Sequence, residues 1–318
     1  ANFGFLGRTR PVSVSGTKRC DEEHGVTRLQ TLRTMHTLNT EREKRVEPLF
    51  SVPQAGQPLI DIPTNLGFTL RGPAANDAMR LQYAPFSVDT PYEPIEVFLT
   101  LLATHDGGTY FDVGANLGYF SLVAACNRAA EAALVVHAFE PAPFYHGLLR
   151  HNISANRQGT TIRPHPCALT DRAGEQTLHL FDTNTSLDPN WSQEVRGQAA
   201  LATTSVRTSK LDDLFDPADL VPPFIFKIDV EGTELAVLLG GERLLRSPES
   251  AFVLVEAHRD SEEQHAVLRT LSAWGYTCLG LARYSAGEYF NIWNDRLIPL
   301  EAAEKDSSMW CSYWMCLR

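Results

Sequence analysis

The sequence predicts an α/β fold of Rossmann-like type, with a mostly parallel sheet and helices on both faces. Three segments indicate it: Thr109–Phe111, Leu134–Phe139 and Phe224–Ile228 are short, apolar, β-rich runs, and a helix-compatible stretch follows each one. Apolar strands that alternate with helices are typical of a sheet whose parallel strands are joined by covering helices. We therefore expect ligands at the carboxyl edge of this sheet, where such folds bind them.

A glycine turn separates the first strand from its helix. The segment Phe111–Phe120 reads FDVGANLGYF, with glycines at Gly114 and Gly118 that allow a sharp turn. Loops that bind dinucleotides carry G-x-G-x-x-G, whose second glycine lets the backbone approach the pyrophosphate. Asn116 occupies that place, which disfavours a pyrophosphate and hence an NAD-dependent oxidoreductase. The loop suits a ligand without phosphate, such as S-adenosylmethionine, whose ammonium group Asp112 would pair.

The second strand ends in an acidic residue. Glu140 follows Leu134–Phe139 and lies about 20 residues beyond the glycine turn, the distance at which an acid meets ribose hydroxyls in nucleotide-binding units. The glycine turn and this carboxylate together predict a site for an adenosine-containing cofactor.

A third motif makes the chain similar to a known family. It resembles the FkbM-type methyltransferases, a branch of the class I S-adenosylmethionine-dependent enzymes, over roughly residues 90 to 295. The resemblance rests on four segments: FDVGANLGYF at 111–120, AFEP at 138–141, KIDVEGTE at 227–234 and LVEAH at 254–258. It implies a seven-stranded class I methyltransferase sheet and O-methylation of a hydroxyl on a sugar, glycolipid or secondary metabolite. A non-catalytic cofactor-binding module is the alternative.

The resemblance also implies which residues contact the cofactor. A further strand is expected over Thr160–Leu169, and a contact with the adenine is expected at its end, at Ala168. The predicted cofactor-binding residues are Asp112, Gly114, Ala115, Asn116, Gly118, Glu140, Pro141 and Ala168.

Three side chains are candidates for the catalytic base. Methyl transfer to a hydroxyl oxygen needs a group that accepts the hydroxyl proton. Asp229 and Glu231 follow the third apolar strand, and His258 follows the next one, with a side chain that ordinarily titrates near neutral pH. We rank Glu231 first, because Gly232 beside it leaves room for a substrate. Asp229, Glu231 and Glu256 would also offer oxygen ligands to Mg²⁺, but nothing in the pattern demands a metal, and none is predicted.

The rest of the chain divides around this domain. Residues 1–57 predict a partly disordered N-terminal extension, and residues 58–106 a β-hairpin or cap followed by a helix that begins at Pro91–Pro94. Residues 107–295 form the predicted methyltransferase domain, and residues 296–318, rich in aromatic side chains, a C-terminal packing segment. A polar stretch at 182–200 is long for a connection inside a compact domain and is typical of a functional loop.

Composition excludes some classes of protein. The 318 residues carry a net charge of −10, which argues against a broad nucleic-acid interface. The six cysteines show no metal-binding spacing, which favours a reducing, cytoplasmic location, and no apolar run reaches the roughly 18 residues of a membrane helix. Residue 1 is Ala, compatible with a processed or truncated start. We expect a small-molecule or glycan acceptor as partner; the pattern leaves the oligomeric state open.

Overall fold

The computed structural model describes residues 58–73, 94–181, 184–191, 197, 199–257, 261–281 and 297–318, and every structural statement below concerns these residues. They belong to one compact unit, Pro48–Arg318. The predicted N-terminal extension, residues 1–57, and the candidate base His258 lie outside the described residues. Among the helices described, none is long and apolar enough to cross a bilayer.

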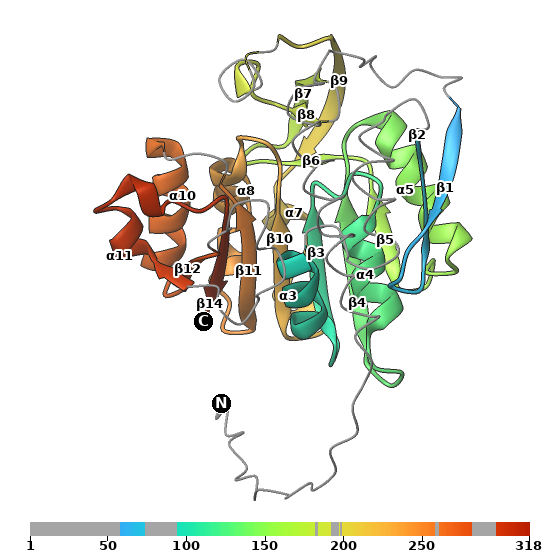
Figure 1. Cartoon of the computed structure of the whole chain (residues 1–318), viewed down its shortest axis with the longest axis horizontal. Helices are drawn as coiled ribbons and strands as arrows, with labels where there is room; N and C mark the ends of the chain where they lie inside the picture. The colour runs from blue at the N-terminus through green and yellow to red at the C-terminus, as the bar shows by residue number, and fades with distance from the viewer. Residues whose placement is uncertain are drawn as a thin grey trace, which may run out of the picture. The chain divides into compact units, whose positions relative to one another are not determined.

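The centre of this unit is an eight-stranded sheet with the order β13-β12-β14-β11-β10-β3-β4-β5 (Figure 1). Its strands are β3 (Gly108–Val113), β4 (Leu134–Phe139), β5 (Ile162–His165), β10 (Phe224–Ile228), β11 (Ser250–Glu256), β12 (Thr277–Leu281), β13 (Leu297–Pro299) and β14 (Tyr313–Leu317). Strands β5, β4, β3, β10 and β11 run parallel, whereas β14 is antiparallel to both β11 and β12. The mostly parallel Rossmann-like sheet is thus confirmed. The short edge strand β13 is an eighth strand beyond the seven expected.

Helices cover both faces because the strands are apolar on both sides. In β10, Phe224, Phe226 and Ile228 point to one core, and Ile225 points to the other. The helices of the Ile225 side are α3 (Pro94–Thr104), α4 (Tyr119–Asn127) and α5 (Pro143–Ala155). Those of the opposite side are α7 (Leu211–Leu214), α8 (Glu234–Gly240), α9 (Glu242–Leu245) and α10 (Glu262–Ala273).

A second, four-stranded sheet has the order β6-β9-β7-β8. Its strands are β6 (Ala168–Leu169), β7 (Gly174–Leu180), β8 (Thr185–Ser186) and β9 (Ala202–Ser209). The sequence suggested one strand over Thr160–Leu169, but this stretch divides between the two sheets, with β5 in the large one and β6 in the small one. The small sheet lies at the end of the large one, beyond β3 and β10 (Figure 1).

The N-terminal hairpin differs from the one expected. The sequence suggested pairing of two β-like runs near residues 68–71 and 79–83. In the structure β2 (Thr69–Pro73) instead pairs with the preceding β1 (Leu59–Pro63), antiparallel, and the run at 79–83 lies outside the described residues. The hairpin is fixed to α5 by Asn152 and Asn156, whose side-chain oxygens accept the N–H groups of Arg71 and Thr69 at 2.8 and 2.9 Å.

The C-terminal residues contribute to the large sheet. After the short helices α11 (Leu300–Ala303) and η4 (Ser307–Met309), β14 inserts between β11 and β12, and Trp314 on it is fully buried. The remaining short helix is η2 (Pro217–Asp219). A closing strand expected at 289–293 falls outside the described residues.

Candidate active site

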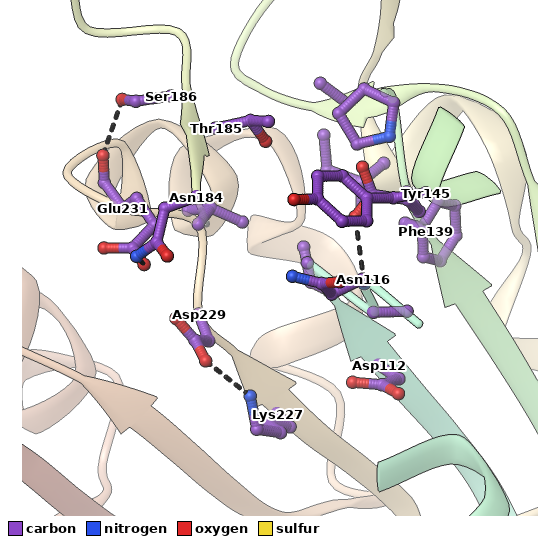
Figure 2. A pocket seen from close by; sticks show the side chains of 18 of the residues that line it. Asp112, Asn116, Phe139, Tyr145, Asn184, Thr185, Ser186, Lys227, Asp229 and Glu231 are labelled. Atoms are coloured by element: carbon purple, nitrogen blue, oxygen red, sulfur yellow. Dashed lines mark hydrogen bonds and ion pairs between the residues drawn. The ribbon is translucent and has the colours of Figure 1, made fainter. Parts of the chain in front are cut away.

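A pocket opens where the carboxyl ends of β3, β4, β10 and β11 meet the small sheet (Figure 2). Every described candidate from the sequence lines it except Gly118: Asp112, Gly114, Ala115, Asn116, Glu140, Pro141, Ala168, Asp229 and Glu231. Apart from Ala168 at the start of β6, these residues come from the ends of β3, β4 and β10, which are far apart in the chain. Parallel pairing of β3 with β4 and with β10 brings them together, because it aligns the carboxyl ends of these strands at one edge.

Both glycines of the turn allow close packing, and Gly114 also lines the pocket. Gly114 has φ +84°, and a Cβ there would lie 1.9 Å from the carbonyl oxygen of Asp229, so its lack of a side chain lets the ends of β3 and β10 approach. Gly118 has φ +87° and is the N-cap of α4, where a Cβ would meet Leu149 at 2.6 Å. Gly118 therefore sets the turn and the helix start, and it is not among the residues that line the pocket.

Asn116 and Glu140 form one unit. Asn116 has φ +50°, a left-handed conformation that asparagine tolerates better than most residues, and its backbone N–H donates to Glu140 Oε2 at 2.9 Å. Glu140 Oε1 accepts from the N–H of Ala142 at 2.8 Å. Burial raises the pKa of Glu140 to about 7, against the opposing effect of these two N–H donors. The turn thus holds the Glu140 carboxyl group in the pocket wall.

Asp112 carries a polar atom that the described protein does not satisfy. Its Oδ2 accepts from the Ser121 hydroxyl at 2.5 Å, while its buried Oδ1 has no hydrogen-bond partner among the described residues. Burial raises the pKa of this carboxyl group, and the nearby Lys227 opposes the rise. Buried polar atoms are nearly always paired in native proteins. An unpaired oxygen at the pocket wall therefore points to a donor supplied by a ligand.

Lys227 and Asp229 form an ion pair on the pocket floor. Lys227 Nζ lies 2.8 Å from Asp229 Oδ2 and 4.6 Å from the centre of the Phe120 ring, and only 3% of the lysine side chain is exposed. Figure 2 shows this pair below Glu231 and across from Asp112. The carboxylate of Asp229 is therefore already engaged by a buried cation.

Glu231 lies higher in the pocket, against the small sheet. Its Oε1 accepts from the Asn184 side-chain amide, and its carbonyl oxygen accepts from the Ser186 hydroxyl at 2.6 Å (Figure 2). Glu234, two residues after Gly232, has a structural role instead: it accepts from the Gly232 N–H at 2.9 Å and from the Gln264 amide at 3.2 Å. Glu256 also lines the pocket. No group of three His, Cys, Asp or Glu side chains within the described ranges is arranged to hold a metal ion.

Some pocket residues escaped the sequence analysis. Tyr145 on α5, Phe139 at the end of β4 and Tyr313 at the start of β14 line the pocket, as does Pro73 of the hairpin. Aromatic and proline residues of this kind look like core or turn residues in sequence. Asn184–Ser186 was recognisable only as part of a polar loop, because its contact with Glu231 joins residues more than 40 positions apart.

Comparison with known proteins agrees with the motifs. A family model described as the methyltransferase FkbM domain matches residues 112–278, more than half of the chain. The hexuronic acid methyltransferase AglP of Haloferax volcanii is 28% identical over 160 residues, covering 50% of this chain and 60% of that protein. The 31-O-demethyl-FK506 methyltransferase FkbM of Streptomyces tacrolimicus is 28% identical over 196 residues, which cover 54% of this chain and 73% of that protein.

A solved structure gives a weaker likeness. A methyltransferase FkbM from Methylobacillus flagellatus superimposes with a TM-score of 0.42 at 15% identity, covering 67% of this chain and 44% of that one. The match thus spans less than half of that chain and about three fifths of AglP.

Proposed function

Since the chain belongs to the FkbM family of methyltransferases, we propose that it transfers the methyl group of S-adenosylmethionine to a hydroxyl oxygen. The observation that carries this proposal is the pocket, in which the glycine turn, Glu140 and Asp112 face Asp229 and Glu231 across one cavity. We further propose that residues 107–295 form the methyltransferase domain, with 58–106 as a cap and 296–318 as a packing segment that adds β13 and β14 to the large sheet of this domain.

The residues present fit this cofactor. S-adenosylmethionine supplies an electrophilic methyl group on a sulfonium when it is bound. Glu140 presents carboxyl oxygens that accept hydrogen bonds from ribose hydroxyls, and Ala168 and Pro141 offer backbone contacts nearby. The unpaired Oδ1 of Asp112 provides an acceptor for the ammonium group. Asn116 leaves no glycine for a pyrophosphate, which argues against a dinucleotide.

We assign the catalytic base to Glu231. The base accepts the hydroxyl proton while the acceptor is held in line with the methyl group, and both effects depend on a fixed side chain. Asp229 is the weaker candidate because the Lys227 ammonium occupies its carboxylate at 2.8 Å; we assign it to orientation of the acceptor. His258 remains a candidate that follows β11 in sequence, outside the described residues.

The names of two relatives support the acceptor class that we propose. AglP is a hexuronic acid methyltransferase and FkbM a 31-O-demethyl-FK506 methyltransferase by name. A hydroxyl of a sugar, glycolipid or secondary metabolite is the acceptor that we propose for this chain. The alternative, a cofactor-binding module without turnover, is disfavoured by the carboxylates of Asp229 and Glu231 in the same pocket.

An acceptor panel tests this proposal. Purified protein is incubated with unlabelled S-adenosylmethionine and neutral hexosides, uronosides or macrolide alcohols, and products are identified by mass spectrometry. We expect a product 14 mass units heavier, methylated on oxygen, for at least one class (one methylene is gained). Cofactor binding without transfer to any hydroxyl would favour the non-catalytic alternative.

Cofactor affinity should depend on pH through Glu140. With its pKa raised to about 7, a fraction of this group is protonated below neutrality, whereas donors from ribose favour the charged form. Binding of S-adenosylhomocysteine should therefore release a proton, and affinity should rise by at most about tenfold per pH unit up to about pH 7, then level off. Calorimetry in buffers of different ionisation enthalpy measures the proton release. Glu140→Gln should bind more weakly with a flatter pH dependence, and an equal slope in both proteins would exclude Glu140 as the titrating group.

A further inference from the structure

The turn after β10 has an unusual backbone. Glu231 adopts φ +59°, in the left-handed region that residues with a Cβ rarely occupy, and Gly232 follows with φ +101°. The asparagine side chain tolerates this backbone conformation, but the glutamate side chain does nothing to favour it. Such a residue keeps its backbone only where surrounding contacts hold it. The conformation therefore directs attention to the contacts of Glu231.

Two side chains of the segment 184–186 contact Glu231, one at its backbone and the other at its carboxylate. Ser186 is 1% exposed, and its hydroxyl donates to the Glu231 carbonyl oxygen at 2.6 Å. The same hydroxyl oxygen accepts from the Asp188 N–H at 2.9 Å, so both its donor and acceptor capacities are used. Asn184 donates from its side-chain amide to Oε1 of the Glu231 carboxylate. Ser186 thus restrains the backbone of Glu231, and Asn184 restrains its carboxylate (Figure 2).

A third contact packs the segment against the turn. A Cβ at Gly232 would lie 2.5 Å from Cδ1 of Trp191, so the indole ring occupies the space beside this glycine. Trp191 is 2% exposed, and its ring lies 6.0 Å from that of Phe181. Within residues 184–191 of the polar loop, Ser186 and Trp191 are therefore packed against the turn and not simply solvated.

The small sheet supplies the rigidity. Ser186 pairs with His179 and Thr185 with Leu180 in the antiparallel β7–β8 ladder, and β7 pairs with β9 along its whole length. Thr185 and Ser186 are thereby fixed to the small sheet, and Asn184 is tied to it by its carbonyl oxygen, which accepts from the Phe181 N–H at 3.0 Å, whereas Glu231 follows β10 of the large sheet. Two sheets meet at this turn, and the hydrogen bonds of Asn184 and Ser186 connect them.

We propose that Asn184 and Ser186 are positioning residues for the base Glu231. This inference rests on the proposed function and extends it to residues outside the motifs of the sequence. Ser186 keeps the backbone in its left-handed conformation, so that the carboxylate enters the pocket. Asn184 fixes one carboxylate oxygen, which leaves the group oriented toward the acceptor hydroxyl. Its N–H also stabilises the charged form, because a donor to a carboxylate favours ionisation.

The kinetic test compares three variants. Asn184→Ala and Ser186→Ala should lower kcat by about 10–100-fold, since a small misplacement of a catalytic group costs up to about 10²-fold. The KM for S-adenosylmethionine should stay within about twofold, because neither contact supports Glu140 or Asp112. The acid limb of the kcat/KM profile should move to higher pH in Asn184→Ala. Asn190→Ala is the matched control: Asn190 is an exposed asparagine of the same segment whose side chain makes no such contact, and this variant should behave as wild type.

Two measurements on the free protein need no acceptor. Amide exchange over residues 230–233 should be faster in Ser186→Ala than in Asn190→Ala, because the turn loses its backbone restraint. The carboxyl carbon of Glu231, assigned by comparison with Glu231→Gln, should titrate at higher pH in Asn184→Ala than in wild type. Unchanged exchange and an unchanged midpoint would overturn the inference.

A double variant separates this inference from the proposed function. If Asn184 acts through Glu231, then Asn184→Ala should add little to the loss already caused by Glu231→Gln. Additive losses would overturn the positioning role while leaving the base assignment intact. A wild-type rate in Glu231→Gln would instead overturn the assignment of the base itself, and the positioning role with it.

Discussion

Replacing Glu231 by glutamine is expected to slow methyl transfer by about 10²–10⁴-fold, the contribution that a positioned general base makes. Glutamine keeps the carbonyl oxygen that can accept from the Asn184 amide, so the side chain can retain its place in the pocket. It loses the ability to accept a proton from the acceptor hydroxyl. Single-turnover methylation, with the acceptor that gives the highest rate in the panel, measures this loss without interference from product release.

Measuring the affinity of Glu231→Gln for S-adenosylhomocysteine shows whether the substitution has damaged the pocket. S-adenosylhomocysteine should bind Glu231→Gln with nearly wild-type affinity, because the proposal assigns Glu231 to the acceptor and Glu140 and Asp112 to the cofactor. Asp229→Asn should lower both the rate and the thermal stability, since it removes the anionic partner of the buried Lys227. A wild-type rate in Glu231→Gln, with cofactor affinity unchanged, would move the base to another residue, with His258 the next candidate.

Replacing Gly114 by alanine is expected to cause the largest loss of stability. The new Cβ would lie 1.9 Å from the Asp229 carbonyl oxygen, and the residue would hold φ +84°. Left-handed backbone costs about 1–2 kcal/mol for alanine and forced overpacking about 1–3 kcal/mol, so we expect a loss of roughly 2–5 kcal/mol in the free energy of unfolding. Thermal unfolding should show a melting temperature lower by roughly 5–15 °C. Cofactor binding should weaken as well, because the turn carries Asn116, which supports Glu140.

A second glycine provides the matched control. Gly147 lies on the exposed side of α5, and a Cβ there would have nothing within 4 Å. Gly147→Ala should leave binding unchanged and stabilise the helix by up to about 1 kcal/mol. Equal melting temperatures for the two variants would show that the ends of β3 and β10 do not approach as closely as the structure has them.

The parallel strands of the central sheet were predictable from the sequence, whereas the insertion of β14 between β11 and β12 was not. The apolar runs at β3, β4, β10 and β11 are long enough and close enough to helical patterns to indicate a parallel sheet. The edge strand β13 was not predictable, because three residues give no period to recognise. The pairing of β1 with β2 was also missed, since either of two neighbouring β-like runs can pair with Thr69–Pro73 on propensity alone.

Some features of the candidate site were likewise predictable from the sequence, and others were not. Spacing along the chain was enough to predict that Glu140, Asp112 and Glu231 lie at one pocket, because strand ends converge in this fold class. Spacing could not separate Gly114, whose turn borders the pocket, from Gly118, which caps a helix, because both need a positive φ. The contacts of Asn184 and Ser186 with Glu231 depend on how the small sheet packs on the large one. Tertiary contacts of that kind leave no periodic signal in a single sequence.

Calorimetric titration of S-adenosylhomocysteine and of NAD into the protein tests the central claim most directly. If this pocket binds S-adenosylmethionine for methyl transfer, S-adenosylhomocysteine should bind the protein at one site. NAD should bind the protein far more weakly than S-adenosylhomocysteine does. Glu140→Ala should weaken S-adenosylhomocysteine by roughly 1–3 kcal/mol, the value of two lost hydrogen bonds to ribose. Tight binding of NAD without binding of S-adenosylhomocysteine, or an affinity for the latter that Glu140→Ala leaves unchanged, would contradict the assignment of this pocket.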